Sequence, residues 1–120
     1  MEFKFTVFAI LHTIFLVYMS SISGQPILGK GSSSDQIISN FAHIPAFALL
    51  GFLWLKAFSK MFINDKQSLI NKITIVCLIL FAVSDEIHQS FVAGRTASAF
   101  DFILDLIGIF FGYLIFKVLV

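Results

Sequence analysis

Four long apolar segments divide this 120-residue sequence and constrain its fold more than any other feature. A helix needs about 20 apolar residues to cross the hydrocarbon core of a bilayer, because each residue advances it by about 1.5 Å. Backbone polar groups find no partners in lipid, so such segments cross as helices. We therefore predict four helices, at about residues 5–23, 39–62, 69–92 and 102–120, all long enough to span a membrane.

The composition agrees with a membrane protein. Hydrophobic residues make up 58% of the chain and charged residues 12%, whereas soluble domains carry about 25% charged residues; the mean hydropathy is +0.97. Four spans leave no room for a soluble region, so residues 1–120 are predicted to form a single transmembrane domain. The basic residues are scattered, which argues against a nucleic-acid partner. Cys77 is the only cysteine, which excludes an intramolecular disulfide.

The connections between the segments predict how the helices are arranged. Residues 24–34 are rich in Gly and Ser and contain a proline, which is typical of a loop. Residues 63–68 and 93–99 are short connections, which favour antiparallel neighbours. Pro45 is expected to bend the second helix. The sequence thus predicts an all-α integral membrane bundle of four antiparallel transmembrane helices, and a bundle this small is compatible with homo-oligomerisation.

The lysines predict the orientation, because loops rich in Lys and Arg stay in the cytoplasm. One side of the predicted bundle carries only Lys30 and Arg95. The other carries six lysines: Lys4, Lys56, Lys60, Lys66, Lys72 and Lys117. We therefore expect both termini to be cytoplasmic.

The first segment has a second interpretation, as a cleaved signal peptide. Lys4 precedes its apolar stretch, and Ser21-Ile22-Ser23 offers small residues for cleavage. The apolar stretch is long for a signal, and its removal would leave three spans with their ends on opposite sides. We therefore favour a first transmembrane helix.

A group of polar and ionisable side chains interrupts the apolar segments near their predicted outer ends. An acidic residue at a helix centre in lipid costs about 2.5–3.5 kcal/mol by insertion scales, so intramembrane charges mark functional sites by default. The predicted site lies in the outer leaflet and comprises His43, Asp85, Glu86, His88, Gln89, Arg95, Asp101 and Asp105.

Helical spacing predicts which of these side chains share a face. In the third helix, Asp85, His88 and Gln89 have i, i+3, i+4 spacing, and Glu86 lies about 100° round the axis. These residues are expected to present their polar groups toward the other helices.

The fourth helix carries a stripe of Asp101, Asp105, Gly108 and Gly112. Gly108 and Gly112 form a small-xxx-small pair of the kind that lets helix backbones approach closely. The two acids continue this packing face, so they are expected to point into the bundle. Acids one turn apart repel one another unless a proton or a cation intervenes.

Several chemistries fit these residues. The favoured interpretation is a hydrogen-bonded network in which Arg95 neutralises Asp101 or Asp85 and the histidines contact carboxylates. Such a network is either structural or the floor of a site for a polar lipid headgroup, where Arg95 is suited to phosphate. A metal held by His43 or His88 with Glu86, Asp101 or Asp105 is an alternative, but no metal-binding motif is recognised, and no cofactor is expected.

Two motifs carry a resemblance to the VanZ-like family of small bacterial membrane proteins. The first is D-E-I-H-Q-S-F-V-A-G-R-T at residues 85–96, and the second is D-F-I-L-D-L-I-G at residues 101–108, followed by Gly112-Tyr113. His43 and F-A-L-L-G at residues 47–51 are similar to the family's second helix. The chain departs from the family pattern in three places. Ser39-Asn40 replace Asp-Lys, Ala93 replaces Pro, and Asp105 replaces Asn, which changes the charge of the site.

The resemblance implies a compartment and a phenotype, because the family's namesake is associated with low-level resistance to the glycopeptide teicoplanin. We expect a multi-pass protein of the bacterial cytoplasmic membrane that binds a lipid or lipid-linked cell-wall precursor. One alternative is an intramembrane enzyme acting on a lipid phosphate or ester, with His88 or Glu86 as general base. The other is a proton-coupled small transporter.

Overall fold

The computed structural model describes residues 2–21, 41–61, 66–92 and 99–120. These residues contain four α-helices and no strand: α1 (Phe3–Ser21), α3 (His43–Ala57), α4 (Lys66–Gln89) and α5 (Ala99–Leu119). The prediction of an all-α fold is confirmed. Helices α1, α4 and α5 are long and apolar enough to cross a membrane.

Helix α3 is shorter than predicted. As described, it has 15 residues, ends at Ala57 instead of near residue 62, and is not among the helices long enough to span. The predicted first residues, 39 and 40, lie outside the described part of the chain. The chain turns away after Ala57, and Lys60 adopts a positive φ of 60°. The carbonyl groups at this end find partners elsewhere: Glu2 donates its backbone N–H to Ala57 at 2.8 Å, and Gln67 donates its side-chain amide to Phe58 at 3.1 Å. These partners satisfy the carbonyl groups of Ala57 and Phe58, which have no partner within the helix.

Pro45 lies close to a break between helical residues. Helix α3 begins at His43, so Pro45 falls in its first turn. The first backbone N–H groups of a helix have no partner within the helix, so the N–H that proline lacks is not needed there. Phe41, two residues before α3 begins, is also helical, and Ala42 between them has helical angles (φ −63°, ψ −21°). The break at Ala42 thus lies three residues before Pro45, and the bend expected at Pro45 stays a prediction, because the residues before Phe41 lie outside the described part of the chain.

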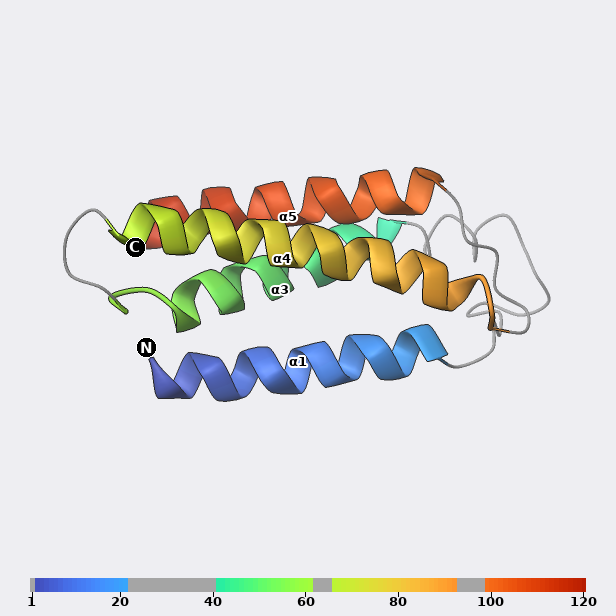
Figure 1. The fold of residues 1–120 in the computed structure, drawn as a ribbon, viewed down its shortest axis with the longest axis horizontal. Coiled ribbons are helices and arrows are strands. Elements are labelled where there is room, and N and C mark those ends of the chain that lie inside the picture. Colours follow the sequence, from blue (N-terminus) through green and yellow to red (C-terminus); the bar gives the residue numbers. More distant parts are fainter. Residues whose placement is uncertain (1, 22–40, 62–65, 93–98) are drawn as a thin grey trace.

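The four helices lie side by side along a common long axis, and the two chain ends are marked at the same end of the molecule (Figure 1). In that view the sequence colours run from left to right along α1 and α4, and from right to left along α3 and α5. The last turns of α1 and α4 therefore meet the first turns of α3 and α5 at the right-hand end. We call this the acidic end, because Asp85, Glu86, Asp101 and Asp105 lie there.

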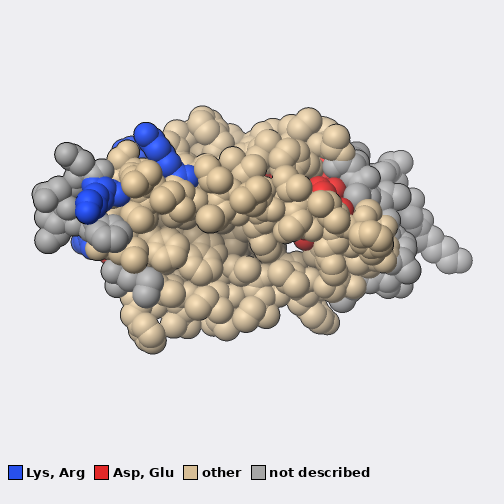
Figure 2. All heavy atoms as spheres, in the orientation of Figure 1, with Lys and Arg blue, Asp and Glu red and all other residues tan. Residues whose placement is uncertain are grey.

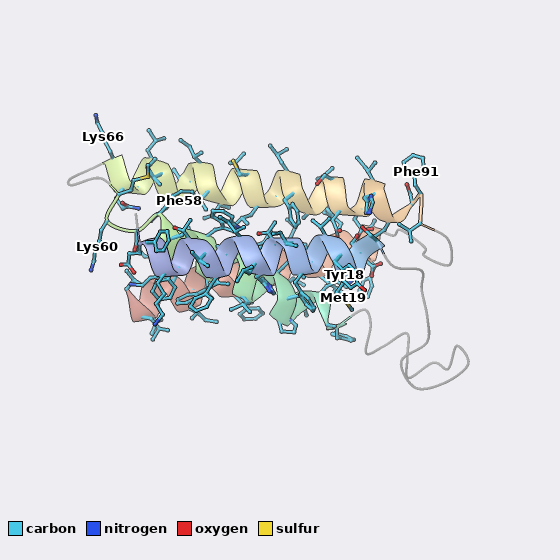
Figure 3. The ribbon with its side chains drawn as sticks, turned by 90° about the horizontal axis from the view of Figure 1, so that it is seen from below. Tyr18, Met19, Phe58, Lys60, Lys66 and Phe91 are labelled. Atoms are coloured by element: carbon cyan, nitrogen blue, oxygen red, sulfur yellow. The ribbon has the colours of Figure 1, made fainter. Side chains whose placement is uncertain are left out.

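Charge is segregated along the long axis. Figure 2 shows Lys side chains at the left end and carboxylates toward the right end of the face in view. Figure 3 places Lys60 and Lys66 at the first end and Phe91 at the opposite one. Glu2 is the described acid at the lysine end, where its carboxylate lies 3.4 Å from the amine of Lys56. This segregation is the pattern that sets the orientation of membrane proteins.

The closest helix packing is between α3 and α5, and it depends on glycine. A Cβ atom on Gly108 would lie 2.5 Å from the carbonyl oxygen of Ile44 and 2.8 Å from the Cβ of Phe47. A Cβ on Gly112 would collide with the carbonyl oxygen of Ala48. Backbones this close require small residues, as the small-xxx-small spacing predicts. The Gly108/Gly112 face of α5 therefore sets how closely α3 and α5 pack.

Two polar contacts join α1 to α3. His12 lies with Nε2 2.9 Å from the carbonyl oxygen of Ala46, to which it donates a hydrogen bond. Trp54 donates its indole N–H to the hydroxyl oxygen of Thr13 at 3.0 Å. Interhelical hydrogen bonds are favourable between membrane helices because lipid offers these groups no alternative partner. They hold α1 against the bundle.

Candidate functional site

A buried histidine–aspartate pair lies at the acidic end. His43 is the first residue of α3, and its Nδ1 lies 2.6 Å from Oδ1 of Asp105 in the first half of α5. Asp105 is completely buried, whereas the side chain of His43 is 13% exposed. The acidic stripe of α5 therefore points into the bundle, where the close α3–α5 packing brings the imidazole onto the carboxylate.

Glu86 of α4 completes a group of three. One ligand-type atom from each of His43, Glu86 and Asp105 lies within 4.8 Å of the other two. The three residues come from three different helices. We call this group the His43–Glu86–Asp105 cluster.

Two further polar residues of α4 lie beside the cluster and pair with each other. Gln89 is 4% exposed, and it donates its side-chain amide to Oδ2 of Asp85 at 3.0 Å. They are four residues apart, which places them on the same side of a helix. Asp101, one turn before Asp105 in α5, is 7% exposed. Among the described residues, four acids thus lie at this end of the bundle, and two of them, Asp101 and Asp105, are buried.

His88 does not join the cluster. It shares a predicted face with Asp85 and Gln89, but its ring is exposed and its Nε2 lies 2.9 Å from Oγ of Ser21, the last residue of α1. Glu86, on the neighbouring part of the helix, takes the inward position instead. The sequence missed Ser21 as a partner. The available signal was that α1 ends at the same predicted depth as His88.

The Ser21–His88 contact resembles a nucleophile–base pair in distance only. The hydroxyl of Ser21 donates to the carbonyl oxygen of Val17 at 2.7 Å. A hydroxyl has one hydrogen, so His88 donates to the serine oxygen and is not placed to take its proton. The contact therefore ties α1 to α4 and does not activate a nucleophile.

Arg95, predicted to be the cation of the site, lies outside the described residues. Among the predicted site residues that the structure describes, His43, Glu86 and Asp105 come together, Asp85 pairs with Gln89, and His88 stands apart. Gly108 and Gly112 lie at the α3–α5 contact.

An apolar groove of about 430 Å³ lies between α1, α3 and α4. Its walls include Thr13, Leu50, Trp54, Thr74, Cys77 and Phe81, and Figure 2 shows the surface hollowed between α4 and α1. The polar atoms in these walls have partners within the bundle, such as the hydroxyl of Thr74, which donates to the carbonyl oxygen of Ile70 at 2.8 Å. The groove therefore presents an apolar surface with no polar group left to satisfy.

Aromatic rings connect the groove to the cluster. Phe81 lines the groove and packs against Phe47, with ring centroids 6.1 Å apart. Phe47 in turn lies parallel to the ring of His43, with centroids 6.5 Å apart and an interplanar angle of 9°. One side of this aromatic contact is an apolar groove and the other is a polar cluster.

One of three comparisons with known proteins identifies a family for the chain. No curated protein and no solved structure matches the chain. A family model described as VanZ/LLP1 matches residues 3–120, which include all four helices, the cluster and the glycine pair. The chain belongs to the VanZ/LLP1 family.

Proposed function

We propose that this protein binds a membrane lipid or a lipid-linked cell-wall precursor, with the hydrocarbon chain in the apolar groove and the headgroup at the acidic end. The observation that carries the proposal is the position of the apolar groove, which is connected to the His43–Glu86–Asp105 cluster by the contacting rings of Phe81 and Phe47. An amphipathic ligand needs these two surfaces next to each other. Ligand sites typically combine apolar walls with a few polar groups that fix orientation.

The charge distribution favours one side of the membrane for the headgroup. Lysines favour the cytoplasm, so the acidic end faces outward in a bacterial cytoplasmic membrane and both termini lie inside. The headgroup then lies in the outer leaflet, where lipid-linked precursors are used for cell-wall synthesis and where glycopeptide antibiotics act. Binding there would alter susceptibility to antibiotics of the teicoplanin type.

The chemistry of the cluster suits a headgroup with hydrogen-bond donors. Ionised carboxylates accept hydrogen bonds from hydroxyl, amide and ammonium groups, and such charge-assisted bonds are about twice as strong as neutral ones. Sugar and peptide portions of a precursor, or the ammonium of a phospholipid, supply these donors.

The proposal is tested first by lipid retention. Detergent-solubilised protein is incubated with a polyprenyl phosphate and with phosphatidylethanolamine, and bound lipid is counted by native mass spectrometry. We expect wild-type protein to retain one of them. Cys77→Trp, which fills the groove, and Glu86→Gln, which removes a carboxylate charge, should each reduce retention at least tenfold.

The matched control is Ile87→Ala, because Ile87 is next to Glu86 in α4 but is 58% exposed on the outside of the bundle. It should retain lipid as the wild type does. In a teicoplanin-sensitive bacterium, wild type and Ile87→Ala should raise the inhibitory concentration, and Glu86→Gln at equal membrane abundance should not. Wild-type protein that retains neither lipid and gives no protection would show the proposal to be wrong.

A further inference from the structure

We propose that His43, Glu86 and Asp105 form a binding site for one divalent transition-metal ion, with zinc as the best match. One imidazole nitrogen and two carboxylate oxygens are ligands that Zn²⁺ accepts. Three protein ligands leave a fourth position open, the arrangement found where a zinc ion also binds a water or a substrate. The inference rests on the geometry of the cluster and not on the lipid proposed above.

The separations fit an ion. Zinc lies about 2.0–2.2 Å from nitrogen and oxygen ligands, so two ligand atoms on opposite sides of one ion are at most about 4.4 Å apart. The three atoms lie within 4.8 Å of one another. A glutamate side chain has three rotatable bonds, so a small rotation of Glu86 is enough to close this difference. Each of the three ligand residues is carried by a helix, which limits how far their side chains have to move to bind an ion.

An unsatisfied oxygen points to a missing partner. Asp105 uses Oδ1 to accept from His43 at 2.6 Å. The residue has no exposed surface, and its other oxygen, Oδ2, is buried without a hydrogen-bond partner in the described part of the chain. A buried charged oxygen without a partner is unfavourable, and coordination to a cation satisfies it.

The charge balance also favours a cation. Asp85 and Asp101 lie near the cluster, in addition to its own two acids. Buried acids that repel one another are stabilised by a divalent ion between them. If the proposed lipid carries a phosphate, the open position of the metal also offsets the repulsion between that phosphate and these acids, a consequence that does rest on the proposed function.

The binding test uses full-length protein in detergent, with a histidine-free tag and no added lipid. Zn²⁺ is titrated by calorimetry, and Co²⁺ is added separately because its visible absorption reports nitrogen and oxygen coordination. We expect one ion per chain and a higher Tm with Zn²⁺, because a ligand that binds only the folded state stabilises it. Glu86→Gln and His43→Ala should each weaken binding at least tenfold.

The matched control is His88→Ala, since His88 lies on the same end of the bundle but contacts Ser21 instead of the cluster. It should bind one ion with unchanged affinity. Circular dichroism establishes that each variant is helical, and the Co²⁺ spectrum of the wild type tests the site without any substitution. Wild-type protein that binds no ion, or a His88→Ala variant that loses binding as fully as His43→Ala, would overturn the inference. Because lipid is absent, neither result depends on whether the lipid proposal is correct.

Discussion

Nδ1 of His43 lies 2.6 Å from Oδ1 of Asp105, which is 62 residues later in the sequence. The pair joins the first turn of α3 to the first half of α5. It lies at the acidic end of the same α3–α5 contact that the two glycines make close. The polar site and the packing of this bundle are therefore built on one helix pair.

Removing both members of this pair should cost less than the sum of the two single losses. His43→Leu or Asp105→Leu leaves a polar partner buried, with an expected loss of about 1–3 kcal/mol in the free energy of unfolding. The double variant leaves neither, so its loss should be smaller than the sum. Unfolding of the four proteins in detergent measures this coupling. Asp105→Asn is the control, since its amide oxygen still accepts from His43; additive losses would contradict the interpretation.

Gly112 should not tolerate a side chain. In Gly112→Ala the new methyl group meets the carbonyl oxygen of Ala48 and, at 3.0 Å, the backbone nitrogen of Phe52. Overpacking of this kind typically costs about 1–3 kcal/mol. Thermal unfolding in detergent measures the loss.

Gly51 provides the matched control for that variant. A Cβ on Gly51 would lie 3.5 Å from the carbonyl oxygen of Ile109, an ordinary contact distance. Because alanine is favoured over glycine in a helix by about 1 kcal/mol, Gly51→Ala should be neutral or slightly stabilising. Equal losses for Gly51→Ala and Gly112→Ala would show that the α3–α5 spacing is not set by Gly112.

The hydrogen bond from Trp54 to Thr13 should contribute little on its own. Side-chain hydrogen bonds between membrane helices average about 0.6 kcal/mol. Trp54→Phe and Thr13→Val each remove it while keeping most of the packing, and the double variant completes a cycle. We expect a coupling of about 0.5–1.5 kcal/mol. A coupling of zero would mean that α1 is held by packing alone.

The proposed orientation predicts which end is accessible from outside the cell. Met61 directly follows Lys60, which lies at the lysine end, and is 44% exposed. Phe91 lies at the acidic end and is 84% exposed. In a Cys77→Ala background, Phe91→Cys should react with a membrane-impermeant maleimide on intact cells. Met61→Cys should react only after the cells are lysed. The reverse pattern would place the acidic end in the cytoplasm.

Much of the fold could be predicted from local sequence. The apolar lengths near 69–92 and 102–120 predicted α4 and α5 to within three residues at each end. The spacing of Gly108 and Gly112 predicted a close helix contact, and Asp101 and Asp105 on the same stripe are buried as expected. Helix α3 was predicted too long, because the partners that end it, Glu2 and Gln67, come from other segments.

The sequence by itself determined that this chain is helical and that its helices suit a membrane. It also determined that, in the last two helices, the lysines and the acids lie at opposite ends. Hydrophobic length and charge position are properties of each segment alone. Only the tertiary structure decided that Glu86 meets His43 and Asp105, while His88 turns to Ser21. Neighbouring residues differ by about 100° around a helix axis, and the rotation of α4 about its axis is set by packing against the other helices. Residues that were predicted to share one face of α4 therefore contact different partners.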